Sequence, residues 1–362
     1  MNDNRDTFID FLRGLAIVDM ILVHYAGNFP EVISKFIIYH DIAMEGFLLL
    51  SGVIVGMHYL PLFIADRSST VKTIYLRTFK LCLIQYIMIV SISLPEFILR
   101  SGSIDCAGIG DFLLDSFTFS NQIGLIHILP TFIPLFILSP LFIYLLSRNF
   151  DYILLLGSAF FFLIAQWNPY LFNYDDKTIF PVVLWQIYFV AGCCLGKVAL
   201  GNGTSMPRHK RALFIVSLIT LTAALFFRHS TSICPLIATF MNRYSISIQR
   251  FPLNIYGLIW GSLLWLFIYM AAAQFWSGIR NTKFVDWTAL FGRNSLMTFV
   301  LHVYFAKTIS FTHILFGSNM TINYTGILLN IGVTYYLLLK YEQALKENQH
   351  GLFFRTAKWL FK

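Results

Sequence analysis

Charged residues are scarce in this chain: Asp, Glu, Lys and Arg together make up only 12% of its 362 residues. Hydrophobic residues make up 57%, and the mean hydropathy is +0.69. So low a charge content excludes an ordinary soluble domain, in which about a quarter of the residues are charged. The composition instead predicts a membrane protein that crosses the bilayer several times.

Cysteine is also scarce, and the five cysteines show no spacing of the kind that binds a metal. No metal cofactor is therefore expected. Cys106 and Cys234 fall in connections that we expect on the outer side of the membrane, and a disulfide between them is left open.

The chain lacks any long block of Lys and Arg interleaved with aromatic residues, so its formal net charge of +8 does not indicate a nucleic-acid partner. The basic residues are spread over many short connections. Such connections are typical of a protein whose main partner is the lipid bilayer, where basic residues collect on the cytoplasmic side.

Apolar segments long enough to cross a bilayer recur along the whole chain. They cover residues 8–28, 40–62, 73–98, 128–147, 151–168, 179–200, 212–228, 253–276, 289–311 and 322–340. We therefore predict an all-α polytopic membrane protein, one domain over residues 1–362, with about ten transmembrane helices. The acidic leader and Arg13 indicate that the first segment is a retained span and not a cleaved signal peptide.

An even number of spans places both chain ends on the same side of the membrane. Of the 26 Lys and Arg residues, 19 fall on the side that would hold both termini and 7 on the other. The positive-inside rule then predicts that both termini are cytoplasmic.

Polar residues interrupt the first apolar segment. A polar side chain inside a membrane is costly, so we expect each one to be paired with another group or to have a function. In an ideal helix Asp10, Arg13 and His24 fall on one stripe, with Arg13 and His24 about 16 Å apart along the axis. Asp19 points to the opposite face, where we expect a role in packing or hydrogen bonding. The stripe thus carries a carboxylate and a guanidinium near one membrane surface and an imidazole near the other.

The second apolar segment runs back from the outer side, so His40, Asp41 and Glu45 are expected at about the depth of His24. An imidazole oriented by a carboxylate is the minimum that general base catalysis requires. Glu45 and His24 could instead form a buried polar pair that only fixes how two helices pack. The polar stripe on the first segment favours the catalytic interpretation.

Arg13 also has two interpretations. Its guanidinium could reach the lipid headgroups and do nothing more. It could instead bind a phosphate or polarise a carbonyl, for which its planar donors are suited. Gly14 beside it is expected to leave room for a ligand to approach the backbone.

Later segments contain further polar candidates. Trp185 and Gln186 interrupt an apolar segment and either line a cavity or hydrogen-bond between helices. Ser295 and His302 are seven residues apart and share a helix face, whereas Arg293 points the other way. His302 is either a satisfied core histidine or part of a site.

Two pairs of glycines are spaced four residues apart within apolar segments: Gly52 with Gly56, and Gly192 with Gly196. This spacing of small residues is more typical of close helix packing than of a ligand site. We therefore predict close helix contacts at both pairs.

Several short motifs, taken in order, resemble those of the membrane-bound acyltransferase-3 superfamily. Arg13, ten further residues and His24 are similar to its Arg-x10-His signature, and residues 46–52 resemble its Phe-Phe-x-x-Ser-Gly element. Residues 184–186 and 292–296 look most like the branch that succinylates osmoregulated periplasmic glucans. Residues 301–302, Leu-His, are more similar to the general superfamily.

The resemblance implies an enzyme of the bacterial inner membrane that moves an acetyl or succinyl group from cytoplasmic acyl-CoA to an envelope carbohydrate. The acceptor would be a hydroxyl of a periplasmic glucan, an O-antigen or a similar glycan at the outer face. Acyl-CoA would be the co-substrate, and a thioester needs no metal for this transfer. The acyl group, the acceptor sugar and the oligomeric state stay open.

The candidate residues divide into three groups. We expect His24 as general base, with Glu45, Arg13 and Asp10 as further catalytic residues. Acyl-CoA would be held by Arg13, Arg77, Arg293 and Ser295, and the acceptor by His40, Asp41, Trp185, Gln186 and His302. An extended acyl-pantetheine arm is about 20 Å long by ordinary bond lengths, comparable with the separation of Arg13 and His24.

A proton-coupled transporter, or a transporter of an anionic substrate, is the alternative, because the same intramembrane residues could carry protons or bind an anion. A transporter of this kind is expected to show broken helices in corresponding halves and an internal repeat. The sequence shows neither, so acyl transfer is favoured.

Overall fold

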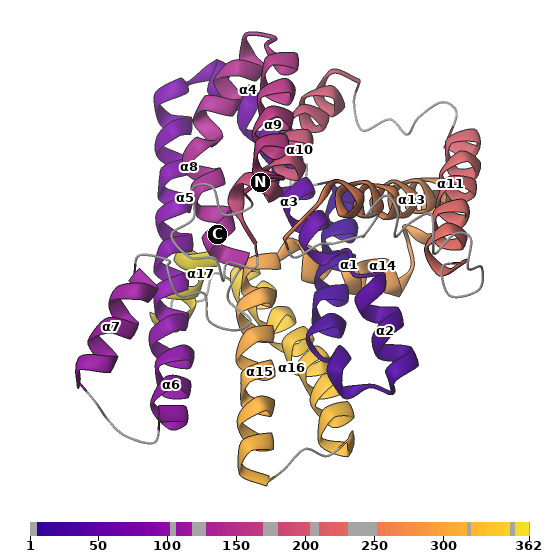
Figure 1. Ribbon diagram of the computed structural model, residues 1–362. Helices are drawn as coiled ribbons and strands as arrows, with labels where there is room; N and C mark the ends of the chain where they lie inside the picture. The colour runs from indigo at the N-terminus through magenta and orange to yellow at the C-terminus, as the bar shows by residue number, and fades with distance from the viewer. Residues whose placement is uncertain are drawn as a thin grey trace. The chain divides into compact units, whose positions relative to one another are not determined.

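The computed structural model describes residues 6–101, 106–117, 128–168, 180–202, 210–230, 252–316, 320–347 and 352–361 (Figure 1). Within these ranges the regular secondary structure is helical and no β-strand is present. The prediction of an all-α fold is confirmed for this part of the chain. Cys234 lies outside the described residues, so the open question of its disulfide with Cys106 is not addressed.

Contacts between the helices divide the chain into two compact units. Unit 1 contains Met1–Phe47, Val71–Ile137 and Asn281–Lys362, and unit 2 contains Leu48–Thr70 and Leu138–Arg280. Unit 1 therefore joins helices from both ends of the sequence, which brings residues more than 250 positions apart into contact.

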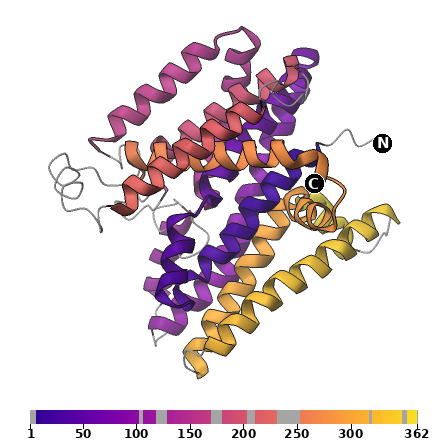
Figure 2. The same cartoon turned by 90° about the vertical axis from the view of Figure 1, so that its right-hand side faces the viewer.

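The helices of unit 1 begin with α1 (Thr7–His24), the 3₁₀ turn η1 (Ala26–Asn28), α2 (Glu31–Tyr39) and the start of α3 (Ala43–Ile54). They continue with most of α5 (Arg67–Met88), the π-helical η3 (Ile89–Ser93), α6 (Leu94–Ser101), α7 (Cys106–Phe117) and the first half of α8 (Ile128–Ser147). The last group is α14 (Lys283–Arg293), α15 (Ser295–Phe316), α16 (Met320–Lys346) and α17 (Leu352–Phe361). Figures 1 and 2 show α15 and α16 side by side.

Unit 2 contains the rest of α3, the π-helical η2 (Val55–Tyr59), α4 (Leu60–Ala65) and the second half of α8. Its other helices are α9 (Asp151–Ala165), α10 (Val182–Asn202), α11 (Lys210–Ser230) and α13 (Ile255–Ile279). The pairs α9 with α10 and α11 with α13 pack against each other.

Each of the ten predicted apolar segments contains a helix. In the described part of the chain, five helical stretches are long and apolar enough to cross a membrane: Glu31–Ala65, Arg67–Ile98, Ile128–Ser147, Val182–Leu200 and Ile255–Ile279. These stretches identify a membrane protein, whereas the count of ten spans and the cytoplasmic termini stay predictions. Helix α1 lies outside this set and carries three charged residues, Asp10, Arg13 and Asp19.

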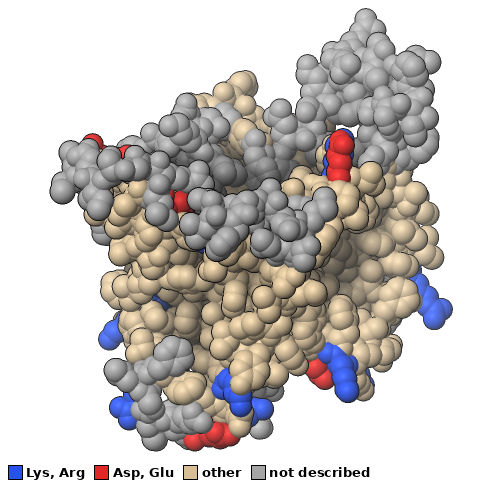
Figure 3. Space-filling model, turned by 90° about the horizontal axis from the view of Figure 1, so that it is seen from below, with Lys and Arg blue, Asp and Glu red and all other residues tan. Residues whose placement is uncertain are grey.

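Large apolar side chains cover much of the described surface. Val32, Leu156 and Leu328 are 81%, 67% and 73% exposed. Among the residues drawn in colour in Figure 3, most are uncharged, and the Lys, Arg, Asp and Glu side chains lie toward the edges of the view. Such a surface suits contact with lipid tails, because exposing apolar side chains to water is unfavourable in free energy.

The glycine pairs lie where α3 and η2 cross α10 with their backbones in contact. A Cβ added to Gly52 would overlap the carbonyl oxygen of Phe189, and one added to Gly192 would overlap that of Leu49. The same holds one turn further on, between Gly56 and Gly196 and the facing backbones. The predicted close helix packing is confirmed.

We expect Gly192→Ala to lower the unfolding temperature of the protein in detergent, because a new methyl group must push two helix backbones apart. Overpacking of this kind costs about 1–3 kcal/mol. Gly157 on α9 is the matched control: nothing lies within 4 Å of the place that its Cβ would take. Gly157→Ala should be neutral or stabilise by up to about 1 kcal/mol through helix propensity. Equal unfolding temperatures for the two variants would contradict the close packing.

Candidate functional site

Helices α1 and α14 of unit 1 cross with their backbones in contact. A Cβ on Gly14 would overlap the carbonyl oxygen of Thr288, and one on Gly292 would overlap the carbonyl oxygen of Asp10. The expectation that Gly14 leaves room for a ligand is therefore wrong, because α14 fills this space. The crossing instead brings the end of α14 against the first turn of α1.

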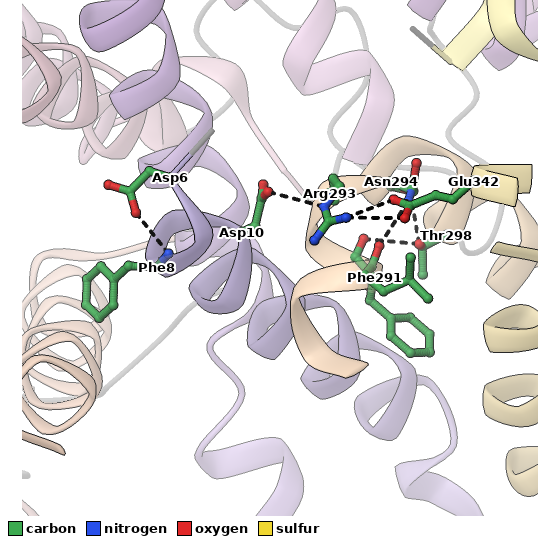
Figure 4. A network of polar contacts seen from close by, with 9 residues as sticks. Asp6, Phe8, Asp10, Phe291, Arg293, Asn294, Thr298 and Glu342 are labelled. Atoms are coloured by element: carbon green, nitrogen blue, oxygen red, sulfur yellow. Dashed lines mark hydrogen bonds and ion pairs between the residues drawn. The ribbon is translucent and has the colours of Figure 1, made fainter. Parts of the chain in front are cut away.

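A network of charged side chains forms at this crossing (Figure 4). Arg293 Nε lies 3.8 Å from Asp10 Oδ2, and Arg293 Nη1 lies 3.2 Å from Glu342 Oε2 on α16. The side-chain amide of Asn294 donates to Glu342 Oε1 at 3.0 Å. Figure 4 shows Arg293 between the two carboxylates. The network fixes the short turn between α14 and α15 against both α1 and α16.

Arg13 joins the same region through Ser295, the first residue of α15. Its side chain is buried, and Nη2 donates a hydrogen bond to Ser295 Oγ. We call Asp10, Arg13, Arg293, Ser295 and Glu342 the arginine cluster. Its two guanidinium groups and two carboxylates balance in charge, which lowers the cost of burying them.

The structure thus brings together four residues from two predicted segments, 8–28 and 289–311: Asp10, Arg13, Arg293 and Ser295. Glu342 was not predicted, because nothing in the local pattern distinguishes it from a solvent-exposed helix residue. Arg77 is engaged elsewhere, since its guanidinium lies 5.5 Å from the ring centroid of Phe136, a cation–π distance. Roles in binding acyl-CoA remain predictions for all of these residues.

At the other end of α1, the His24 ring meets His302 on α15. His24 Nδ1 lies 2.6 Å from His302 Nε2. This distance is shorter than a van der Waals contact of about 3.5 Å and is that of a hydrogen bond, in which the tautomers of the two rings decide which nitrogen donates. The ring planes are only 11° apart and the ring centroids are 4.9 Å apart, so the contact between the two nitrogens lies near the plane of both rings. His24 is half-buried and His302 has no exposed surface.

His302 is held in turn by α16. Asn330 Nδ2 lies 2.9 Å from His302 Nδ1, 3.0 Å from the Tyr25 hydroxyl and 3.5 Å from the His302 carbonyl oxygen. Thr334 Oγ1 lies 3.4 Å from Asn330 Oδ1. We call His24, His302, Asn330, Tyr25 and Thr334 the histidine network. The structure shows His302 fully buried with both ring nitrogens in hydrogen-bonding contact, and a role of His302 in a site remains a prediction.

Asn330 and Tyr25 were missed by sequence reasoning. A weak signal existed for Asn330, which interrupts the apolar segment 322–340 and has Thr334 four residues later. Tyr25 gave none, because a tyrosine at the end of a membrane helix is common at the bilayer interface.

The carboxylate of Asp19 accepts a hydrogen bond from the Ile42 amide at 2.7 Å, and Asp41 Oδ1 accepts one from the Ala43 amide at 2.9 Å. The two side chains satisfy free amides at the start of α3. The hydrogen-bonding role predicted for Asp19 is confirmed, and Asp41 is a helix cap.

Helix α3 therefore starts beside Asp19, which is about 7.5 Å along α1 from His24. The expectation that the second segment begins level with His24 is wrong, because α2 intervenes before α3. Glu45 is fully buried in the first turn of α3. His40 contacts its own helix, with Nδ1 2.8 Å from the Phe36 carbonyl oxygen. Catalytic or substrate contacts of Glu45, His40 and Asp41 remain predictions.

Trp185 and Gln186 belong to unit 2. Gln186 makes two hydrogen bonds of 2.8 Å with Ser158, which link α10 to α9. Trp185 is fully buried beside Phe180 and Tyr188. Of the two interpretations of Gln186, the structure shows the bond between helices, and contact of either side chain with a substrate is untested.

A second buried ion pair lies further along α15. Lys307 Nζ lies 2.6 Å from Glu96 Oε2 on α6, with only 10% and 9% of the two side chains exposed. Tyr304 on the same helix contacts Ser91 of η3, with 2.5 Å between the hydroxyl oxygens. These contacts fix the helix that carries His302 against η3 and α6.

Among the described residues, no group of three or more His, Cys, Asp or Glu side chains could hold a metal ion. The functional groups near His24 are instead imidazoles, a carboxamide and hydroxyls. These groups exchange protons and hydrogen bonds with organic substrates, which is the chemistry of general acid–base catalysis.

Taken together, the fold and the histidine network define a helical membrane protein with buried acid–base groups in one unit. The sequence matches the family described as OpgC protein over residues 5–343, which include both the arginine cluster and the histidine network. This chain belongs to the OpgC protein family. The family name points to an acyltransferase like the glucan succinyltransferases. No curated protein and no solved structure gives a match.

Proposed function

We propose that this protein is a membrane-bound O-acyltransferase that moves an acetyl or succinyl group from acyl-CoA to a hydroxyl of an envelope carbohydrate. Acyl-CoA is used on the cytoplasmic side and the carbohydrate is modified at the outer face of the bacterial inner membrane. The observation that carries the proposal is the 2.6 Å contact of His24 with His302, since His24 lies on the same helix, α1, as Arg13. Family membership supports the same reaction class.

His24 acts as the general base in this proposal. The hydroxyl oxygen of the sugar attacks the thioester carbonyl carbon, and its proton passes to His24. The new carbon–oxygen bond forms, the carbon–sulfur bond breaks, and the proton then passes to the leaving thiolate of CoA. His302 keeps the His24 ring in place and shares one of its protons throughout.

The arginine cluster supports a donor site at the opposite end of α1. Arg13 and His24 are eleven residues apart on one straight helix, about 16 Å along its axis. An acyl-pantetheine arm of about 20 Å spans this distance by ordinary bond lengths. With CoA held near Arg13, the thioester therefore reaches the ring that activates the acceptor.

The test is acyl transfer by the purified protein in proteoliposomes, with acetyl-CoA or succinyl-CoA as donor and periplasmic glucan as acceptor. We expect release of free CoA thiol that depends on the glucan, and a glucan heavier by one acetyl or one succinyl unit per transfer. The mass increase identifies the acyl group. Absence of thiol release with both donors, together with proton or anion uptake into the vesicles, would favour the transporter instead.

A further inference from the structure

We propose that Asn330 is a positioning residue that decides, through His302, which ring nitrogen of His24 carries the lone pair. The inference rests on the proposed acyl transfer, since it says how the base of that reaction is prepared. Its basis is an unbroken chain of contacts: 2.6 Å from His24 Nδ1 to His302 Nε2, then 2.9 Å from His302 Nδ1 to Asn330 Nδ2. In the proposed arrangement this carboxamide is turned end for end, so that its oxygen takes the place of Nδ2.

A neutral imidazole has one N–H group and one nitrogen with a free lone pair. The single proton between His24 Nδ1 and His302 Nε2 can therefore be bonded to either of these two nitrogens. If the proton is bonded to His302 Nε2, the proton of neutral His24 is on its own Nε2, and that nitrogen can only donate a hydrogen bond. If the proton is bonded to His24 Nδ1, His24 Nε2 keeps its free lone pair. Only the second arrangement leaves His24 able to take a proton from a sugar hydroxyl.

In the second arrangement the N–H of His302 is on Nδ1 and points at Asn330, which must then offer an acceptor. A carboxamide has an oxygen and a nitrogen at nearly equal positions, and it can turn end for end without moving its other atoms. With its oxygen toward His302, Asn330 accepts from His302 Nδ1. Asn330 is thereby the residue that makes the base form of His24 possible.

The other partners of Asn330 fit this orientation. Tyr25 lies 3.0 Å from the carboxamide atom that faces His302, and Thr334 lies 3.4 Å from the opposite one. Both are hydroxyls, which can donate or accept as required. The bond to the His302 carbonyl oxygen is lost, and two acceptor oxygens then face each other at about the same 3.5 Å, the longest distance of the set. Asn330 and Thr334 have no exposed surface, so water does not compete for these bonds.

Two substitutions of Asn330 test whether this position must supply a hydrogen-bond acceptor or a hydrogen-bond donor. Asn330→Asp offers only oxygen to His302, and Asn330→Leu offers neither group at a similar volume. We expect Asn330→Asp to keep transfer within about tenfold of the wild type. Asn330→Leu should lower kcat by about 100-fold or more, because loss of the group that fixes a catalytic tautomer costs up to about 10⁴-fold in serine proteases. The KM for acyl-CoA should change less than about twofold in both.

The outcomes for this pair are decisive. Equal loss of kcat in Asn330→Asp and Asn330→Leu would show that a donor is needed at this position and would overturn the proposal. Wild-type kcat in Asn330→Leu would overturn it as well. A purely structural role would lower the amount of folded protein for both variants without separating their kcat values.

A second measurement needs neither a substrate nor a folded Asn330 variant. Nitrogen NMR of the wild-type protein with ¹⁵N-labelled histidine distinguishes the two imidazole tautomers, and the His24 signals are those missing in His24→Ala. We expect neutral His24 to carry its proton on Nδ1. A proton on Nε2 would refute the role of Asn330, whether or not the protein transfers acyl groups. Failure of the proposed function alone would appear as the Nδ1 tautomer without any thiol release.

Discussion

His24→Ala should lower acyl transfer by about 10²–10⁴-fold, which is the usual contribution of a general base. The physical reason is that the sugar hydroxyl is a weak nucleophile until its proton is removed. His24 is the half-buried member of the pair, whereas its partner His302 is fully enclosed. The neighbouring Tyr25 is not expected to replace it, because its hydroxyl is hydrogen-bonded to Asn330.

Transfer should be measured as glucan-dependent thiol release, beside the unfolding temperature of the same preparation. His58→Ala is the matched control, since His58 is an exposed histidine in η2 of unit 2 and should keep wild-type transfer. His302→Ala should cost nearly as much as His24→Ala, and the double variant little more than either, because residues that act as one unit are not additive. Unchanged transfer by folded His24→Ala would eliminate the proposed mechanism.

The helices were predictable where hydrophobicity alone determines them. Helix α8 ends at Ser147, as the predicted segment does, because the apolar sequence changes there to the polar Arg148 and Asn149. The predicted segment 289–311 was less accurate, since it joins the end of α14 to α15. The break at Asn294 depends on its bond to Glu342, 48 residues away, which no local pattern reveals.

The candidate site was predictable along one helix but not between helices. The spacing of Asp10, Arg13 and His24 follows from helix geometry, so the sequence alone could place them on one stripe. The ring that contacts His24 belongs to His302, 278 residues further along the chain. Helix periodicity cannot predict a contact between residues so far apart in sequence. The depth predicted for α3 was wrong for a related reason, because no local pattern predicted helix α2 before it.

Lys307 shows most clearly how a charge count can miss a buried pair. From the sequence, Lys307 is only one of the seven basic residues predicted on the outer side. In the structure it is buried, with Nζ 2.6 Å from Glu96 Oε2. We expect Lys307→Met to destabilise the protein by about 3–5 kcal/mol, because it leaves the Glu96 carboxylate buried without its cation. The unfolding temperature in detergent is the measurement, and Lys283→Met is the control, since Lys283 is exposed at the start of α14.

The double variant Lys307→Met, Glu96→Leu distinguishes the ion pair from simple packing. Removing both charges also removes the desolvation that each one costs, so stability should return to near or above the wild-type value. Losses that add in the double variant would show that the two side chains act independently. Because Lys307 stands five residues after His302 on α15, the single variant should also lower acyl transfer, and the double variant should restore it. Recovery of stability and transfer together would show that this pair holds α15 in the position that the histidine network requires.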